Sequence, residues 1–410
     1  MTAIAWEDTS SVHLSDDFQE FCGYVFGTLY RADQRRAGET YLHGLLNCPG
    51  RKSIRRMAAI MPGRHSEQSL QQFVNQSPWD HEPIRQRLMS RLSRHMRPVA
   101  WAIEEVAFPK HGRHSAGVER QYVRSLEKVC NCQLAITVTL TGERLSIPVN
   151  WRLVVPDSWG DDTDRRSRAR MPAAERPRPY WQYQLEVIDD MVLDWGMPAA
   201  PVAVDARQLA TAEVLFTALE NRELPYLAQV SPSLGVRLDG RVRPVAGPTG
   251  PLAPRPSWNG AVDQVIRLFA DAPRTTVGWP DAENDSIVRR SQFIQIPVRS
   301  PAADSTTGAH AGSPARQLLV EWPLGKPRPR GYWITNLTDR PLGDLVALAK
   351  LRQNVRSHLE TFADRFGLRD YEGRTFAGWH HHVTLASAAY VYDILSAVDA
   401  DPPQTRLALA

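Results

Sequence analysis

The spacing of apolar residues changes along the chain. Between residues 14 and 100 they recur every three or four positions, as in FQEFCGYVFGTLY (18–30) and EPIRQRLMSRLSRHM (82–96). This spacing is typical of helices that bury one face. We therefore predict an N-terminal helical domain over residues 1–97.

From residue 98 the pattern becomes typical of strands and then alternates. Three stretches rich in β-branched and aromatic residues are separated by turn residues: PVAWAIEEVAF (98–108), CQLAITVTL (132–140) and LSIPVNWRLVVP (145–156). After them we predict a helix at 180–196, a short strand at 200–206, a helix at 209–224 and a strand at 225–232. Strands followed by alternating helices and strands predict an α/β (α+β) fold, a mixed sheet flanked by helices.

Residues 232–330 have a different composition, with Pro/Gly-rich stretches at 240–260 and 300–316. Such stretches cannot bury a core, so we expect mobile surface linkers there. We interpret 232–330 as an insertion. It would divide the core into a first part, 98–231, and a C-terminal part, 331–410, that contains two long helices.

Composition narrows the class of protein. The chain is 42% hydrophobic and 23% charged, which is ordinary for a globular protein. It has no apolar run long enough for a membrane span and no secretory signal at its start, so we expect no membrane contact. Four cysteines do not make a disulfide framework, and a reducing cytoplasm fits them. The net charge of +4 indicates nucleic acid only weakly.

The segment WAIEEVAF (101–108) carries the first candidate chemistry. Neighbouring side chains of a strand point to opposite faces, so only one of Glu104 and Glu105 can face a given site. The simplest interpretation is a half-exposed strand with one solvated and one paired glutamate. The alternative is a metal-binding or acid/base carboxylate held on a rigid strand.

The predicted order of elements is that of the ribonuclease-H-like fold. In that fold, carboxylates from the first strand, from the end of the fourth strand and from a late helix converge on divalent metals. Glu104 and Asp205 fall at the first two of these places.

Several segments also resemble the insertion-sequence 701 family of DDE transposases, in order and over nearly the whole chain. These segments are YLHGLL (41–46), LQQFVNQSPWD (70–80), GVERQY with NCQ (117–133), RLVVPDSWGDDTDRR (152–166), and GLRDY with GWHHHVTLA (367–386). The resemblance implies DNA as partner and Mg²⁺ or Mn²⁺ as cofactor. It also implies that the His380–His382 run is a structural helix start rather than a metal tract.

At the positions of the family's three metal-binding carboxylates, the chain departs from the pattern. The first strand of the family has Val-Asp-Glu-x-Gly-Phe, where this chain has Glu104 in place of the Asp. Asp205 keeps the second carboxylate. On the late helix, Arg352 keeps the Arg of the family's Arg-x3-Glu pattern, and Arg356 stands at the Glu position.

These departures predict weak metal binding by Glu104 and Asp205. An added methylene moves a carboxylate by about 1.5 Å, and Mg²⁺ tolerates little distortion of its ligand shell. Arg356 places a cation where a cation should bind. Glu360, one helical turn later on the same face, is a candidate for a displaced third ligand. We also expect Arg352 and Arg356 to form ion pairs with the two acids.

Three hypotheses follow. In the first, the protein is a decayed or domesticated transposase with weakened or lost strand transfer, which needs no cofactor and keeps DNA as partner. In the second, it is a repurposed, metal-independent enzyme that uses Glu104, Asp205, Arg352 and Arg356 on a small-molecule substrate. In the third, it is an atypical nuclease that uses Mg²⁺ or Mn²⁺ with Glu104, Asp205 and Glu360.

Overall fold

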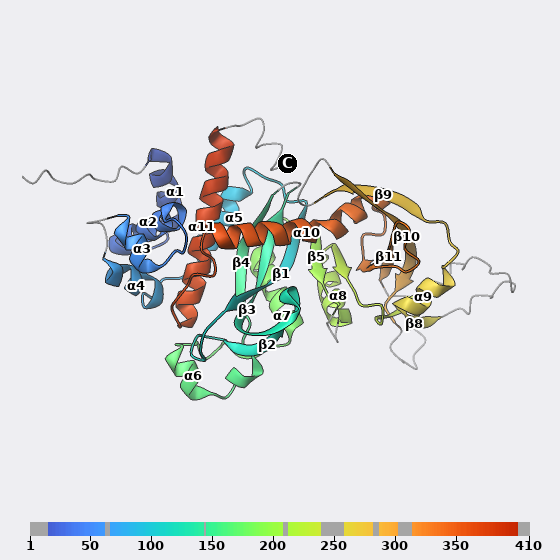
Figure 1. Ribbon diagram of the computed structural model, residues 1–410, viewed down its shortest axis with the longest axis horizontal. Coiled ribbons are helices and arrows are strands. Elements are labelled where there is room, and N and C mark those ends of the chain that lie inside the picture. The colour runs from blue at the N-terminus through green and yellow to red at the C-terminus, as the bar shows by residue number, and fades with distance from the viewer. Residues whose placement is uncertain are drawn as a thin grey trace, which may run out of the picture.

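The structure is a computed structural model that describes residues 15–61, 66–142, 145–207, 212–238, 258–281, 287–301 and 314–400. A long sheet runs through the molecule, and the helices formed by the N-terminal residues lie together at one end of it (Figure 1). The stretches 239–257 and 302–313, which include most of the two predicted linkers, lie outside the described residues.

The N-terminal part is helical, as the periodicity predicts. Serine side chains cap three of its helices by accepting a backbone N–H at the first turn: Ser15, Ser53 and Ser66. Helices α1, α2, α4 and α5 pack on the last helix, α11 (Phe376–Ala400), and α3 packs on α2 and α4. Their bounds are α1 Asp16–Phe26, α2 Ala32–Asn47, α3 Ile54–Ala59, α4 Glu67–Asn75 and α5 Glu82–Leu92.

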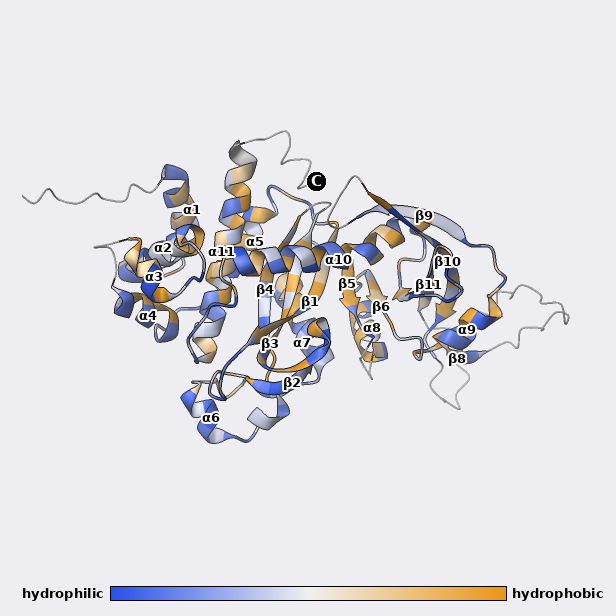
Figure 2. Cartoon of the chain, in the orientation of Figure 1, coloured by the Kyte–Doolittle hydropathy of each residue, from blue (hydrophilic) through white to orange (hydrophobic). Residues whose placement is uncertain are grey.

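The core is a mixed sheet flanked by helices, a ribonuclease-H-like arrangement as predicted. Strand β1 pairs antiparallel with β3, which also pairs antiparallel with β4, and β1 pairs parallel with β5, which pairs parallel with β6. Figure 2 shows hydrophobic residues along β1, β5 and β6, as expected for strands covered on both faces. The bounds are β1 Ala100–Pro109, β3 Lys128–Thr141, β4 Ser146–Leu153, β5 Val202–Asp205 and β6 Tyr226–Gln229.

The same sheet continues into residues 232–330. In the described part of the chain its order is β2-β3-β1-β5-β6-β12-β11-β10-β7-β8, with β4 and β9 paired beside it. The hydrophobic pattern does not predict β2, β7, β8 or β9. We propose that residues 232–330 are an insertion whose strands extend the core sheet. The bounds are β2 Glu119–Val123, β7 Gly235–Leu238, β8 Asn259–Ala261, β9 Thr275–Pro280, β10 Val288–Arg299, β11 Ala315–Pro323 and β12 Gly331–Thr335.

Helices cover both faces of the sheet. Helix α10 (Leu342–Arg365) crosses one face (Figure 1), with buried Leu345, Val355 and Phe362 on its inner side. Helix α7 (Tyr180–Asp189), which ends in a π turn at Asp190–Asp194, packs on β3 and β4 and on α8 (Ala212–Glu220). Two shorter helices are α6 (Thr163–Arg168) and α9 (Val262–Leu268), and single 3-10 turns lie at Arg124–Leu126 and Asp157–Trp159.

The histidine run on α11 joins the N-terminal helices to the core. All three rings are buried. His381 places its ring nitrogens 2.8 Å from the carbonyl oxygens of Val74 and Trp79. His382 Nδ1 lies 2.9 Å from the hydroxyl of Tyr41, and its Nε2 lies 3.0 Å from the carbonyl oxygen of Gly367. The run therefore packs and hydrogen-bonds within the core, as the resemblance implies.

Because these histidines are buried, we expect the stability of the protein to fall in acid. Desolvation by burial lowers the pKa of His381 and of His382 to about 4, below the unfolded value of 6.5. A folded-state pKa lowered in this way contributes stability above pH 6.5, which is lost as the pH falls towards 4. We predict a loss of about 2 kcal/mol for His382 between pH 7 and pH 5.

Urea unfolding at pH 7 and pH 5 measures this loss. His382→Gln should lower the stability at pH 7 but reduce the fall between the two pH values. The matched control is His114→Gln, because His114 is exposed. An unchanged pH dependence in His382→Gln would contradict the prediction.

No helix within the described ranges is both long and apolar enough to cross a membrane. The described residues include all four cysteines, and none of the four forms a disulfide.

Candidate active site

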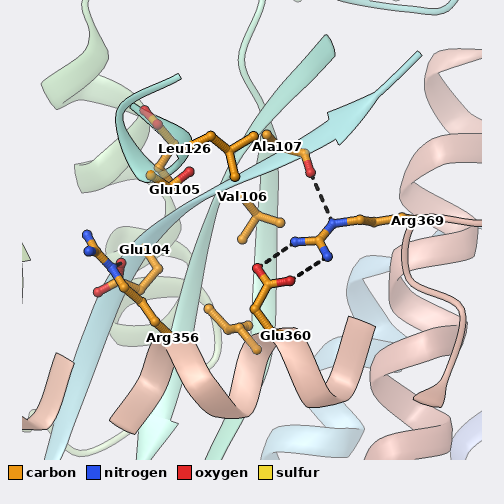
Figure 3. Close-up of a pocket in the computed structure, with 10 residues that line it drawn as sticks. Glu104, Glu105, Val106, Ala107, Leu126, Arg356, Glu360 and Arg369 are labelled. Atoms are coloured by element: carbon orange, nitrogen blue, oxygen red, sulfur yellow. Dashed lines mark hydrogen bonds and ion pairs between the residues drawn. The ribbon is translucent and has the colours of Figure 1, made fainter. Parts of the chain in front are cut away.

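Glu104 and Glu105 lie on opposite faces of β1, as their adjacent positions predict (Figure 3). Glu105 faces α7, where the Tyr180 hydroxyl donates to Oε2 at 2.9 Å and the Arg124 backbone N–H donates to Oε1 at 3.1 Å. Glu104 faces α10 and is 3% exposed. The carboxylate of Glu105 is thus hydrogen-bonded on the α7 face, and Glu104 is the carboxylate of β1 that faces α10.

Two arginines of α10 hold Glu104. Arg352 donates from Nε to Oε1 at 2.6 Å and from Nη2 to Oε2 at 3.0 Å, which is a bidentate pair. Arg356 donates from Nε to Oε2 at 3.3 Å. The two arginines are four residues apart on one helix, so both guanidinium groups reach the same carboxylate.

Asp205 ends β5 beside Glu104. Arg207 donates from Nη2 to its Oδ2 at 2.7 Å and from Nε to its Oδ1 at 3.0 Å. Arg352 Nη1 lies 3.5 Å and Arg356 Nη2 lies 3.9 Å from the same Oδ2. The structure therefore brings together the four residues that the sequence analysis grouped, and it adds Arg207.

The charges of the site shift its pKa values. Burial alone would raise the pKa of Asp205, but the hydrogen bonds from Arg207 and the charge of Arg352 outweigh it and lower the pKa to about 2. Burial alone would lower the pKa of Arg352, but the charges of Glu104 and Asp205 raise it. Asp205 and Arg352 are therefore both charged near pH 7. Three guanidinium groups around two carboxylates leave one net positive charge.

Glu360, the candidate displaced ligand, has a different partner. Arg369 donates from Nη1 and Nη2 to its two carboxylate oxygens at 2.6 and 2.7 Å. Figure 3 shows this pair in the same pocket as Glu104 and Arg356. The pocket is a small cavity of about 180 Å³.

Comparison with known proteins gives the family. The profile of the DDE superfamily endonuclease family matches residues 24–286, more than half of the chain and the part that contains Glu104 and Asp205. The chain belongs to the DDE superfamily endonuclease family. It is also similar to a protein of Microchaete diplosiphon described as "Probable transposase for insertion sequence element IS701", with 34% identity over 101 residues. That match covers 24% of this chain, and the chain spans about a quarter of the relative, 26% of its length.

Membership of this family makes it necessary to ask whether the residues around Glu104 and Asp205 can bind divalent cations. Hard cations such as Mg²⁺ need several oxygen ligands in a near-octahedral shell. Among the described residues, no group of three or more His, Cys, Asp or Glu side chains is placed to hold a metal ion. Both oxygens of Glu104 accept from arginine, and so do both oxygens of Asp205. In this arrangement, the side chains do not fit a bound metal pair.

The low pKa of Asp205 makes the site a source of stability that depends on pH. Because the pKa in the folded protein is below the unfolded value of 3.8, the ion pairs stabilise the fold above that value. This stability is lost as the pH falls towards 2. We predict that Asp205→Asn costs on the order of 2 kcal/mol at pH 6 and roughly half of that at pH 3.

Unfolding by urea at both pH values tests this prediction. The matched control is Asp164→Asn, because Asp164 is exposed and lies 3.9 Å from its partner Arg168. A cost for Asp205→Asn that does not change with pH would contradict the proposed ion pairs.

Proposed function

We propose that this protein is a DNA-binding member of the DDE endonuclease family whose metal-dependent strand transfer is weakened or lost, through decay or domestication. The observation that carries the proposal is that Arg356, at the third ligand position, donates to Glu104 Oε2 at 3.3 Å beside the buried bidentate pair, at 2.6 and 3.0 Å, that the same carboxylate forms with Arg352. A metal ion at Glu104 would have to displace that arginine and leave its charge without a partner, which is costly in a buried site.

The resemblance to the insertion-sequence 701 family supports the same proposal. By that alignment, Glu104 replaces an aspartate and Arg356 replaces the glutamate of the third ligand position. Arg356 also contacts Glu104, so the altered residues form one ion-pair cluster. A cluster of this kind keeps the strands and α10 together without needing a metal.

DNA binding does not require the lost ligands. The site has a net positive charge, and the side chain of Arg356 is 46% exposed. Guanidinium groups bind phosphate through paired hydrogen bonds. We therefore expect the site to attract the phosphate backbone of DNA even without divalent cations.

Fluorescence anisotropy with a labelled duplex tests this function. The purified protein should bind the duplex with the same affinity in EDTA and in Mn²⁺, and more weakly as salt increases, because phosphate contacts release counterions. Absence of duplex binding under both conditions would overturn the proposed function. Binding that requires Mn²⁺ would overturn the metal-independent part of it.

Calorimetry with Mn²⁺ gives a second test. We predict weak binding without a defined stoichiometry, because arginines occupy the two carboxylates. Arg356→Glu should strengthen Mn²⁺ binding, and Arg94→Glu, a change of the same charge at an exposed position, should not. Tight stoichiometric binding by the unmodified protein, lost in Asp205→Ala, would support the nuclease hypothesis instead.

The two alternative functions have less support. The cavity of about 180 Å³ is smaller than the roughly 300–1,000 Å³ of typical small-molecule sites, which disfavours a repurposed enzyme with a substrate of ordinary size. The atypical nuclease needs Glu360 as a ligand, and both of its oxygens accept from Arg369.

A further inference from the structure

A second groove lies away from the candidate active site, between α4, the end of α6 and the segment that leads into α11. Its walls hold amide and guanidinium side chains: Gln68, Gln71, Gln72, Asn75 and Gln76 on one side, and Arg168, Arg170 and Arg374 on the other. The groove also contains Glu372, whose carboxylate pairs with Arg51 at 2.9 Å. Three arginines and a single paired glutamate make the groove positive.

The glutamines form one face of α4. Residues 68, 71, 72 and 75 follow the spacing i, i+3, i+4, i+7, which places them in one stripe along the helix, and Gln76 follows at its C-terminal cap. Gln68, Gln71, Gln72 and Gln76 are exposed. Across the described residues, the side-chain amides of these four make no hydrogen bond. They are therefore available to a ligand.

The groove is held in place from both walls. The Tyr371 hydroxyl donates to Asn75 Oδ1 at 2.6 Å, which fixes the end of α4. Gly373 allows this approach, because a Cβ there would lie 2.1 Å from the same oxygen. On the other wall, the Phe376 backbone N–H donates to the Ala169 carbonyl at 2.8 Å and fixes the segment between Arg168 and Arg170. A fixed groove loses little entropy when a ligand binds.

We propose that this groove binds double-helical DNA, with the glutamine face of α4 in the major groove and the three arginines on phosphates. A glutamine amide can pair with both N6 and N7 of adenine, whereas an exposed face of acidic residues would repel the backbone. Helix α4 has nine residues, about 13 Å, and so reaches about four base pairs. This inference rests on the proposed function and specifies the surface that would recognise the base sequence of the DNA.

The groove lies close along the chain to the candidate active site. Arg369 lines the cavity beside Glu104, and Arg374 lines the groove five residues later. Five residues span at most about 18 Å, which is about five base pairs. A short duplex is therefore long enough to span the distance between Arg369 and Arg374.

The test begins with selection of preferred sequences from a randomised duplex pool by the full-length protein. Affinities for an enriched duplex and for a scrambled duplex are then measured with three double variants. Gln71→Ala with Gln72→Ala should reduce affinity for the enriched duplex about tenfold or more and leave the scrambled duplex nearly unchanged, because alanine keeps the helix and removes base contacts.

The arginine variant should behave differently. Arg170→Gln with Arg374→Gln should weaken binding to both duplexes and reduce the slope of log affinity against log salt by about two. The control, Arg94→Gln with Arg97→Gln, changes two exposed arginines outside the groove and should leave the sequence preference unchanged. Thermal unfolding of each variant checks that it is folded.

The outcomes separate the two proposals. If the unmodified protein binds no duplex, the proposed function and this inference both fail. If it binds duplex DNA but the glutamine variant keeps the full sequence preference, or if no sequence is enriched, the groove proposal fails and the proposed function stands. Preference for structured RNA over duplex DNA would also overturn the groove proposal.

Discussion

Incubated with Mn²⁺ and the duplex DNA that flanks its own gene, the unmodified protein is expected to leave the DNA uncut and unjoined. The attacked phosphodiester is anionic, and catalysis in two-metal sites depends on divalent charge at the entering and leaving oxygens. The guanidinium of Arg356 can offset one charge, but it cannot lower the pKa of an attacking water as a bound metal does. Each tenfold loss of rate corresponds to about 1.4 kcal/mol of barrier, and loss of the metals removes several such factors.

The matching gain-of-function variant is Glu104→Asp with Arg356→Glu. It shortens the first carboxylate and replaces the cation at the third ligand position by an acid, so activity with Mn²⁺ should rise above background. The control is Glu104→Asp with Gln353→Glu, which adds an acid at an exposed position of the same helix. Cleavage by the unmodified protein, abolished by Glu360→Gln, would show that Glu360 leaves Arg369 and acts as the third ligand.

Removal of the buried carboxylate at Glu104 is expected to destabilise the protein by about 3–5 kcal/mol. Glu104 is 3% exposed and the side chain of Arg352 is 9% exposed. In Glu104→Ala the guanidinium of Arg352 therefore loses its bidentate partner without gaining access to water. The measurement is the free energy of unfolding in urea at pH 7.

Glu360→Ala is the matched control for this prediction. Glu360 also forms a bidentate pair with an arginine, but its side chain is 59% exposed, so its loss should cost at most about 1 kcal/mol. The double variant Glu104→Ala with Arg352→Ala should cost less than the sum of the single changes, because no unpaired charge remains. Equal costs for Glu104→Ala and Glu360→Ala would contradict the buried pair.

The positions of the two carboxylates of the site could be predicted from the sequence. Glu104 lies within an apolar strand and Asp205 ends one, and the order of strands and helices is enough to place both in one site. The residues that neutralise them are only partly evident from sequence. Arg352 and Arg356 follow from helical spacing, but the sequence analysis missed Arg207, although its position two residues after Asp205 is a signal that local reasoning could have used.

The sequence by itself determined the helices, the central strands and the placement of Glu104 and Glu105 on opposite faces of β1, because periodicity and apolar pattern are properties of neighbouring residues. The tertiary structure decided which partners the acids have. Glu105 accepts from Tyr180, and Glu360 pairs with Arg369, through contacts that depend on how helices dock on the sheet. Strands β2 and β7 to β9 were missed for the same reason. What stabilises them is hydrogen bonding to a neighbouring strand, which a local pattern does not contain.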